Sequence, residues 1–185
     1  MSAGPLIEIA VLWIIWWYPF LFRAPHVQKR PSITVIGPTR IGLLLESIAF
    51  FCAFLFRLPA GEDPGWLRMG AAAIAGIIGA VGGWTAVDHL GRQFRVHAGL
   101  YEDHELVRTG PYAIVRHPIY ASLLCLLLST MLLTTPWIWW PLPLALFVIG
   151  TEIRVRCEDG LLAGRFGAKF DEYRRDTAAY VPLLR

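Results

Sequence analysis

The sequence predicts an all-α fold, a polytopic membrane helix bundle with five transmembrane helices in a single domain over residues 1–185. Of these 185 residues, 56% are hydrophobic and eight are tryptophan, and the mean hydropathy is +0.51. This composition is too apolar for one water-soluble domain. The apolar residues also gather into five runs, and the basic residues gather on one side of those runs. Together these patterns are typical of a membrane protein.

Each apolar run has about the length that a helix needs to cross a bilayer. A run of 18 residues extends roughly 27 Å at ~1.5 Å per residue, close to the ~30 Å thickness of the hydrocarbon core. The last two runs are separated only by a turn around Thr134, Thr135 and Pro136, which predicts a tight helical hairpin. The predicted spans are 5–22, 41–58, 66–87, 119–135 and 137–153.

The third run contains small residues at every fourth position, at Ala75, Gly79 and Gly83. Small residues at this spacing let two helix backbones approach closely in a membrane. The pattern therefore indicates helix packing, and it does not indicate a nucleotide-binding loop.

The positions of the basic residues predict the orientation in the membrane. With five spans, 15 of the 17 Lys and Arg residues fall on one side, and only Arg57 and Arg68 fall on the other. Because cytoplasmic loops retain Lys and Arg, we expect the N-terminus outside and the C-terminus in the cytoplasm. The net charge of +3 is modest. Topology and anionic lipid explain why the basic residues gather on the cytoplasmic side, so no nucleic acid partner is expected.

Two cytoplasmic stretches are longer than simple connections require, and the chemistry is expected there, within about residues 88–185. The first stretch is 88–118, about thirty residues of mixed charge. The second follows Thr151 and predicts an amphipathic interfacial helix, weakened by Gly164 and Gly167. Its apolar residues at helical spacing are Leu162, Phe166, Phe170 and Tyr173, opposite Arg165, Lys169 and Arg174.

The segment "RTGPYAIVRHPIYASLL" places two polar side chains directly before the fourth span. Pro118 suits a first helical position, so Arg116 and His117 precede a helix N-terminus, where amide groups and the positive end of the dipole favour an anion. This arrangement fits a carboxylate or phosphate arriving from the cytosol. The alternative is that Arg116 reaches lipid headgroups and His117 is an ordinary interfacial residue.

Two blocks of residues resemble a family of integral membrane methyltransferases, the isoprenylcysteine carboxyl methyltransferases and phospholipid methyltransferases. The blocks cover roughly residues 100–182, and the first three spans carry no comparable motif. The first block is Gly110-Pro111-Tyr112, Arg116-His117-Pro118 and Tyr120. The second block is Arg154, Glu158-Asp159, Leu161, Phe166-Gly167, Tyr173 and Val181-Pro182.

The resemblance implies methyl transfer from S-adenosyl-L-methionine to a lipophilic acceptor that enters from the bilayer. It implies catalytic roles for Arg154, which orients an acceptor carboxylate, and for Glu158, which positions Arg154 or the cofactor. The acceptor it favours is isoprenylcysteine-like, from a prenylated small molecule or protein C-terminus, with membrane lipids as neighbours. No metal is implied. The cofactor-binding residues it implies are Tyr112, Arg116, His117, Pro118, Tyr120 and Glu158, under a cap made by the cytoplasmic loop and the C-terminal helix.

Other acceptors and one other reaction remain as alternatives. Ala121, Asp159 and Phe170 replace the family's usual Gly, Glu and Tyr, and these changes bear on the acceptor more than on the reaction. The alternative acceptor is a phospholipid amine. Membrane sterol and steroid reductases that use NADPH carry a similar segment, but with Asn where this chain has Ile119. Methyl transfer is therefore favoured, in a bacterial inner membrane or the endoplasmic reticulum, with the active site facing the cytoplasm.

Several further polar residues need an interpretation. Glu46 lies in the middle of the second span, and it is expected to face the bundle because exposure to lipid is costly. A role for Glu46 in substrate binding stays open. His89, His97 and His104 are irregularly spaced and are interpreted as ordinary loop histidines rather than metal ligands.

Overall fold

The computed structural model describes every residue except 1–2, 24–31, 35–36, 60–61, 96–97 and 183–185. Lys29, Arg30 and His97 therefore lie outside the described residues. The long helices are α1 (Ala3–Tyr18), α2 (Gly37–Leu55), α3 (Trp66–Leu90), α4 (Pro118–Thr134) and α5 (Pro141–Phe166), followed by the shorter α6 (Ala168–Asp176). A π-helical turn, Pro19–Arg23, extends α1, and short 3-10 turns lie at Gly91–Gln93, Gly110–Ala113 and Trp137–Trp139.

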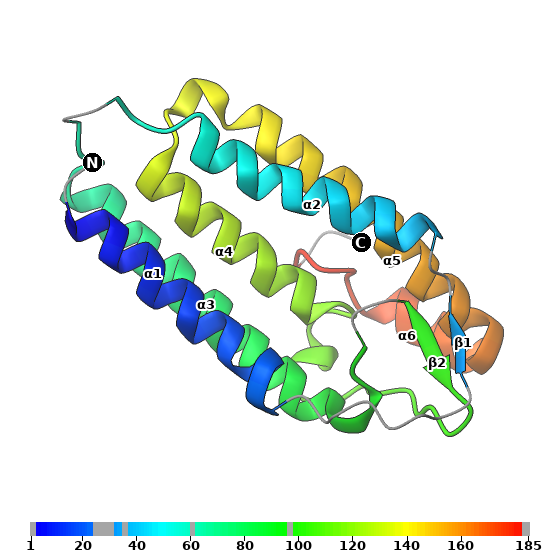
Figure 1. Ribbon diagram of the computed structural model, residues 1–185. Helices are drawn as coiled ribbons and strands as arrows, with labels where there is room; N and C mark the ends of the chain where they lie inside the picture. The colour runs from blue at the N-terminus through cyan, green and yellow to red at the C-terminus, as the bar shows by residue number, and fades with distance from the viewer. Residues whose placement is uncertain (1–2, 24–31, 35–36, 60–61, 96–97, 183–185) are drawn as a thin grey trace.

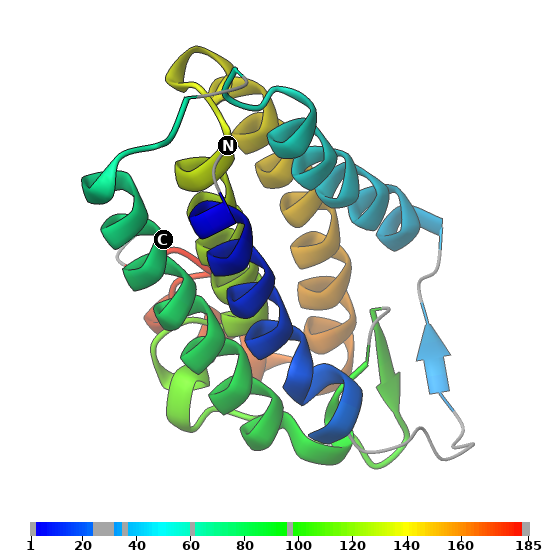
Figure 2. The same ribbon diagram turned by 60° about the vertical axis from the view of Figure 1, so that its left-hand side comes forward.

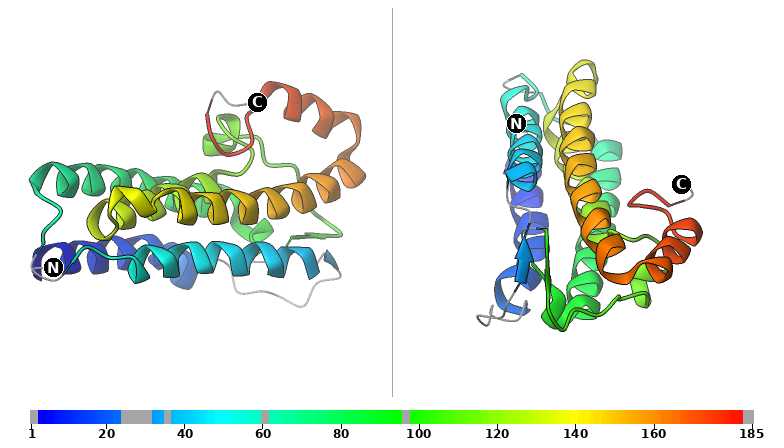
Figure 3. Two further views of the ribbon diagram at one scale, coloured as in Figure 1. Left: turned by 90° about the horizontal axis from the view of Figure 1, so that it is seen from above. Right: turned by 90° about the vertical axis from the view of Figure 1, so that its right-hand side faces the viewer.

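The helices form two layers. Helices α1 and α2 lie in one layer and α3, α4 and α5 in the other (Figure 3). Within this arrangement α1 packs beside α3, α2 packs beside α5, and α4 runs through the middle (Figure 1). The N-terminus lies at one end of the bundle, whereas α6 lies at the opposite end (Figure 1).

The prediction of a helical membrane bundle agrees with this structure. Among the described residues, four segments are long and apolar enough to cross a membrane: Ala3–Arg23, Gly37–Leu55, Trp66–Gln93 and Trp137–Phe166. Helix α4 is apolar but has only 17 residues. It lies at the centre of the bundle, where neighbouring helices cover most of it. A fifth span at α4 therefore stays a prediction.

A small two-stranded antiparallel sheet adds strands to a fold that the sequence predicts as all helical. Strand β1 (Ser32–Thr34) pairs antiparallel with β2 (Gly99–Tyr101), with Ile33 opposite Leu100. Three-residue strands carry too few residues for a periodic signal, and their pairing joins segments far apart in the chain. The strand pair connects the segment before α2 to the loop after α3.

The small residues of α3 pack against α4, as the sequence predicts. A Cβ atom added to Gly79 would lie 2.8 Å from the carbonyl oxygen of Ser122, which is closer than real Cβ contacts allow. A Cβ atom on Gly83 would lie 3.3 Å from the Ser122 Oγ. The two backbones therefore approach so closely that only glycine fits at Gly79.

A second pair of glycines brings α2 against α5. A Cβ atom added to Gly150 would lie 2.6 Å from the carbonyl oxygen of Gly42, and a Cβ atom on Gly42 would lie 2.6 Å from the carbonyl oxygen of Gly150. This close approach places Glu46, one turn after Gly42, beside Arg154, one turn after Gly150. The crossing of two helices thus determines the position of a buried ion pair.

The predicted orientation leads to a labelling experiment. Cysteine is introduced at Glu62, between α2 and α3, or at Arg175 in α6, after the three native cysteines have been replaced. The variant at Glu62 is expected to react with a membrane-impermeant thiol reagent added to intact cells. The variant at Arg175 is expected to react only after the membrane is opened. Labelling of both positions from the same side would contradict five spans.

Candidate active site

A cavity of about 600 Å³ lies at the end of the bundle where α6 and the loop between α3 and α4 are found. Its walls come from both helix layers and from that loop. Such a volume is typical of sites for small molecules. All seven residues that the sequence predicts for the site border this cavity: Tyr112, Arg116, His117, Pro118, Tyr120, Arg154 and Glu158.

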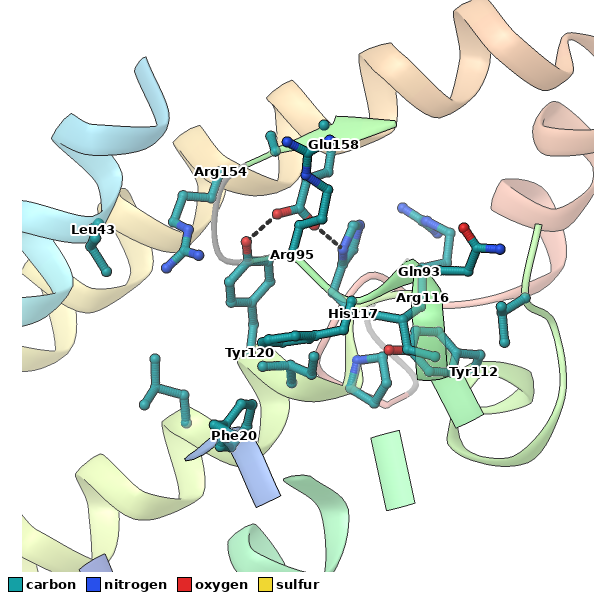
Figure 4. Close-up of a pocket in the computed structure, with 18 of the residues that line it drawn as sticks. Phe20, Leu43, Gln93, Arg95, Tyr112, Arg116, His117, Tyr120, Arg154 and Glu158 are labelled. Atoms are coloured by element: carbon teal, nitrogen blue, oxygen red, sulfur yellow. Dashed lines mark hydrogen bonds and ion pairs between the residues drawn. The ribbon is translucent and has the colours of Figure 1, made fainter. Parts of the chain in front are cut away.

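His117 lies between two carboxylates from α5, and Figure 4 shows its contact with one of them, Glu158. Its Nδ1 is 3.2 Å from Glu158 Oε2, and its Nε2 is 2.8 Å from Asp159 Oδ1. A neutral imidazole carries only one N–H, so both contacts are hydrogen bonds only when the ring is protonated. Burial alone lowers the pKa of His117, but the hydrogen bonds and charges of Asp159 and Glu158 outweigh it and raise the pKa to about 9. His117 is therefore a cation at neutral pH.

Arg116 joins the same group from the other side of Asp159. Its Nη2 lies 3.2 Å from Asp159 Oδ2, and its Nη1 donates to the backbone carbonyls of Arg174 and Thr177. The side chains of Arg116 and Asp159 are 9% and 12% exposed, so this ion pair is largely shielded from water. Two cations and two carboxylates thus balance one another at this wall.

The backbone amides before α4 are not open, which corrects one expectation from the sequence. The amide of Arg116 donates to the carbonyl of Ala178, and the amide of His117 donates to the carbonyl of Ala179, each at 2.8 Å. The sequence places Pro118 correctly at the first position of α4. It gives no sign, however, that a distant segment satisfies the preceding amides.

Tyr120 links the first turn of α4 to Glu158 and Arg154. Its hydroxyl donates to Glu158 Oε1 (Figure 4), and the Arg154 guanidinium lies over its ring, 4.8 Å from the centroid. Glu158 therefore receives hydrogen bonds from two residues of the first motif block, Tyr120 and His117. Both contacts fix the direction of its carboxylate at the cavity wall.

Arg154 forms its ion pair with Glu46 of α2. The Nη1 of Arg154 lies 2.5 Å from Glu46 Oε2, and Thr151 Oγ1 donates to Glu46 Oε1 at 3.0 Å. Glu46 is only 2% exposed and borders the cavity, which confirms that it faces the bundle. The spacing of Arg154 and Glu158 places both on the cavity side of α5, yet Arg154 pairs across the helix layers.

The loop and α6 close the polar end of the cavity. Helix α5 ends at Phe166, where Gly167 adopts a φ of +52°, a conformation that favours glycine. The chain then turns into α6, whose Tyr173 hydroxyl donates to the backbone carbonyl of Tyr112 at 2.5 Å. Burial raises the pKa of Tyr112, so its phenol stays neutral beside the cavity.

The other end of the cavity is apolar. It is bordered by aromatic side chains of α1, its π-helical extension and α2, including Trp13, Trp16, Phe20 and Phe50. Helix α1 runs in front of α4, and α2 lies to the right of α1 as a separate helix (Figure 2). Sequence reasoning did not assign these aromatic residues to a site, because aromatic residues are common throughout membrane spans.

The described histidines outside the motif are His89 and His104. Within the described residues, no group of three or more His, Cys, Asp or Glu side chains has an arrangement suited to a metal ion. His89 Nδ1 lies 2.8 Å from the carbonyl oxygen of Thr85 in its own helix. His104 borders the cavity, which the interpretation as an ordinary loop histidine did not anticipate.

The elevated pKa of His117 predicts a loss of stability at alkaline pH. The folded state gains from the protonated ring, so this gain is complete below the ordinary pKa of 6.5 and is lost as the pH rises through about 9. The difference corresponds to roughly 3 kcal/mol. The thermal unfolding midpoint in detergent is expected to fall between pH 7 and pH 10. The His117→Gln variant should show a flatter profile, and parallel profiles would contradict the assignment.

The chain is similar to known proteins over much of its length. The model of the isoprenylcysteine carboxyl methyltransferase family matches residues 72–164, which include the motif segment before α4 and both Arg154 and Glu158. The chain is also similar to the nickel-cobalt-cadmium resistance protein NccN of Alcaligenes xylosoxydans xylosoxydans. That similarity is 26% identity over 170 residues, covering 86% of this chain and 75% of NccN. The chain belongs to the isoprenylcysteine carboxyl methyltransferase family, as the resemblance of its motifs predicts.

Proposed function

We propose that this protein transfers a methyl group from S-adenosyl-L-methionine to a lipophilic carboxylate at the cytoplasmic face of a membrane. One observation supports the proposal best: a single cavity joins a polar end, with Tyr120, Arg154 and Glu158, to an aromatic end between α1 and α2. A lipophilic acceptor needs such a continuous path, because its tail stays in an apolar environment while its polar group reaches the reacting methyl.

The residues around the polar end fit the cofactor that the family implies. Tyr112, His117, Pro118 and Tyr120 form one wall, and Glu158 lies where its carboxylate is fixed by two hydrogen bonds. When bound, S-adenosyl-L-methionine supplies an activated methyl group on a positively charged sulfur. The side chains of this wall would orient it and exclude water, since positioning provides much of the rate in such a displacement.

Arg154 is the residue that would orient the acceptor carboxylate. Arg154 is 8% exposed and borders the cavity, and its guanidinium is held in place by Glu46 and the ring of Tyr120. A guanidinium presents several N–H groups in a planar fork, which suits a carboxylate. A carboxylate is already ionised at neutral pH, so this reaction requires no general base. An isoprenylcysteine-like carboxylate combines this group with a lipophilic tail.

The test uses purified protein in detergent and measures binding of two cofactors by calorimetry. S-adenosyl-L-methionine is expected to bind and NADPH is not. Lipid extracts are then incubated with protein and cofactor carrying an isotopically labelled methyl group, and the products are identified by mass spectrometry. The label is expected in a base-labile methyl ester. Binding of NADPH alone would instead support a reductase, and a labelled amine would change the acceptor class.

A further inference from the structure

Three residues that border the cavity each have a buried polar atom with no hydrogen-bond partner among the described residues. These atoms are Gln93 Oε1, Arg95 Nη1 and His104 Nδ1. All three residues border the cavity, on the stretch that follows α3. Buried polar atoms are rarely left without a partner, so such a group of them indicates a place where a ligand supplies the missing hydrogen bonds.

Gln93 is the most buried of the three. It ends the 3-10 turn Gly91–Gln93 and is only 5% exposed, and its side chain borders the cavity together with Arg116 (Figure 4). A buried amide oxygen without a donor destabilises the folded protein. A ligand with a hydrogen-bond donor in the cavity would remove this cost.

Arg95 differs from the other arginines that border the cavity in having no carboxylate partner among the described residues. Arg116 and His117 face Asp159 and Glu158, and Arg154 faces Glu46. For Arg95, in contrast, the described part of the chain shows no ion pair, and its guanidinium stacks 4.7 Å from the centroid of the Tyr101 ring. Stacking leaves the edge of the guanidinium available to an anion.

We propose that Gln93 and Arg95 bind the amino-acid end of S-adenosyl-L-methionine, with the cofactor's carboxylate on Arg95 and its ammonium group on the carbonyl oxygen of Gln93. The inference rests on the proposed function. An α-amino acid carries one acceptor and one donor group on the same carbon atom, and these two residues offer an unmatched donor and an unmatched acceptor. The acceptor carboxylate already has a candidate partner, Arg154, near the aromatic path.

The experiment compares two ligands that differ only in the amino-acid end. S-adenosylhomocysteine retains that end, whereas 5′-methylthioadenosine lacks it. In Arg95→Gln the dissociation constant of S-adenosylhomocysteine is expected to rise about 10- to 100-fold, because a hydrogen bond to a charged group is lost. The constant for 5′-methylthioadenosine should stay within about two-fold. Arg95→Lys should recover part of the loss, and Gln93→Leu should show a smaller, equally selective effect.

The control is Arg92→Gln, which removes an exposed arginine of the same segment that pairs with Asp103 and Glu105. It is expected to change neither constant. Equal weakening of both ligands by Arg95→Gln would overturn the inference, as would a rise in the acceptor KM with unchanged affinity for S-adenosylhomocysteine. Failure of the native protein to bind S-adenosylhomocysteine would instead overturn the proposed function, and the inference with it. If Arg95→Gln does not fold, Gln93→Leu decides on the same two ligands.

Discussion

Replacement of Glu158 by glutamine is expected to lower the rate of methyl transfer by about 100-fold or more. Its carboxylate accepts hydrogen bonds from the Tyr120 hydroxyl and from the protonated ring of His117. Hydrogen bonds to a charged group contribute about 1.5–3 kcal/mol each, and a neutral amide weakens both. The glutamine amide would also direct an N–H group towards the Tyr120 hydroxyl or the His117 ring, and both of these are themselves donors. Single-turnover assays with labelled cofactor measure the rate.

A matched control lies six residues earlier in α5. Glu152 also accepts a hydrogen bond from a tyrosine, Tyr180, at 3.0 Å, and it pairs with a cation, Arg156, as Glu158 pairs with His117. It does not border the large cavity. Glu152→Gln therefore removes similar contacts and is expected to retain nearly full activity. Equal losses in the two variants would show that the effect of Glu158 is structural, and a fully active Glu158→Gln protein would remove Glu158 from the site.

The substitution Arg154→Lys separates a carboxylate acceptor from an amine acceptor. Lysine keeps the positive charge opposite Glu46, which alanine would leave buried and unpaired. It loses the planar fork, however, so methyl transfer to a carboxylate is expected to fall about 10- to 100-fold. The rate of the native protein should stay nearly flat between pH 6 and pH 8, because the acceptor is already ionised.

An amine acceptor would give the opposite results. A protonated amine must lose a proton before it attacks, so the rate would climb with pH towards the pKa of the amine, with Glu158 as the candidate base. Arg154→Lys would then be tolerated. The control Arg156→Lys changes an arginine whose side chain is 81% exposed, and it is expected to behave like the native protein. A steep pH profile together with a fully active Arg154→Lys protein would contradict a carboxylate acceptor and leave methyl transfer intact.

The sequence predicts the helices well because long apolar runs and prolines act locally. Pro118 starts α4 as predicted, and the turn at Thr135 and Pro136 separates α4 from the segment leading into α5. The two-stranded sheet was not predicted, since the pairing of Ile33 with Leu100 depends on contacts between distant segments. The boundaries of the last span also differ, because α5 continues to Phe166 without a break.

The same contrast between local signals and contacts of distant segments applies to the candidate site. Its motif residues were identified because they follow one another at fixed spacing and resemble a known family. Their partners were not: Glu46 and Arg154 are 108 positions apart, and nothing in the local sequence of either residue indicates the other. Gln93 and Arg95 were missed for a different reason. Their signal is the lack of a partner in the folded structure, which no pattern of residue types reveals.

The segment that covers the amides before α4 has a consequence for how the protein is made. Arg116 donates to Thr177, which is 61 positions further along the chain, and the amides of Arg116 and His117 need Ala178 and Ala179. Because the chain is synthesised from its N-terminus, Arg116 and His117 are made well before these partners. The nascent chain therefore carries a loop that has its motif residues but not their final contacts until the segment after α6 has been made.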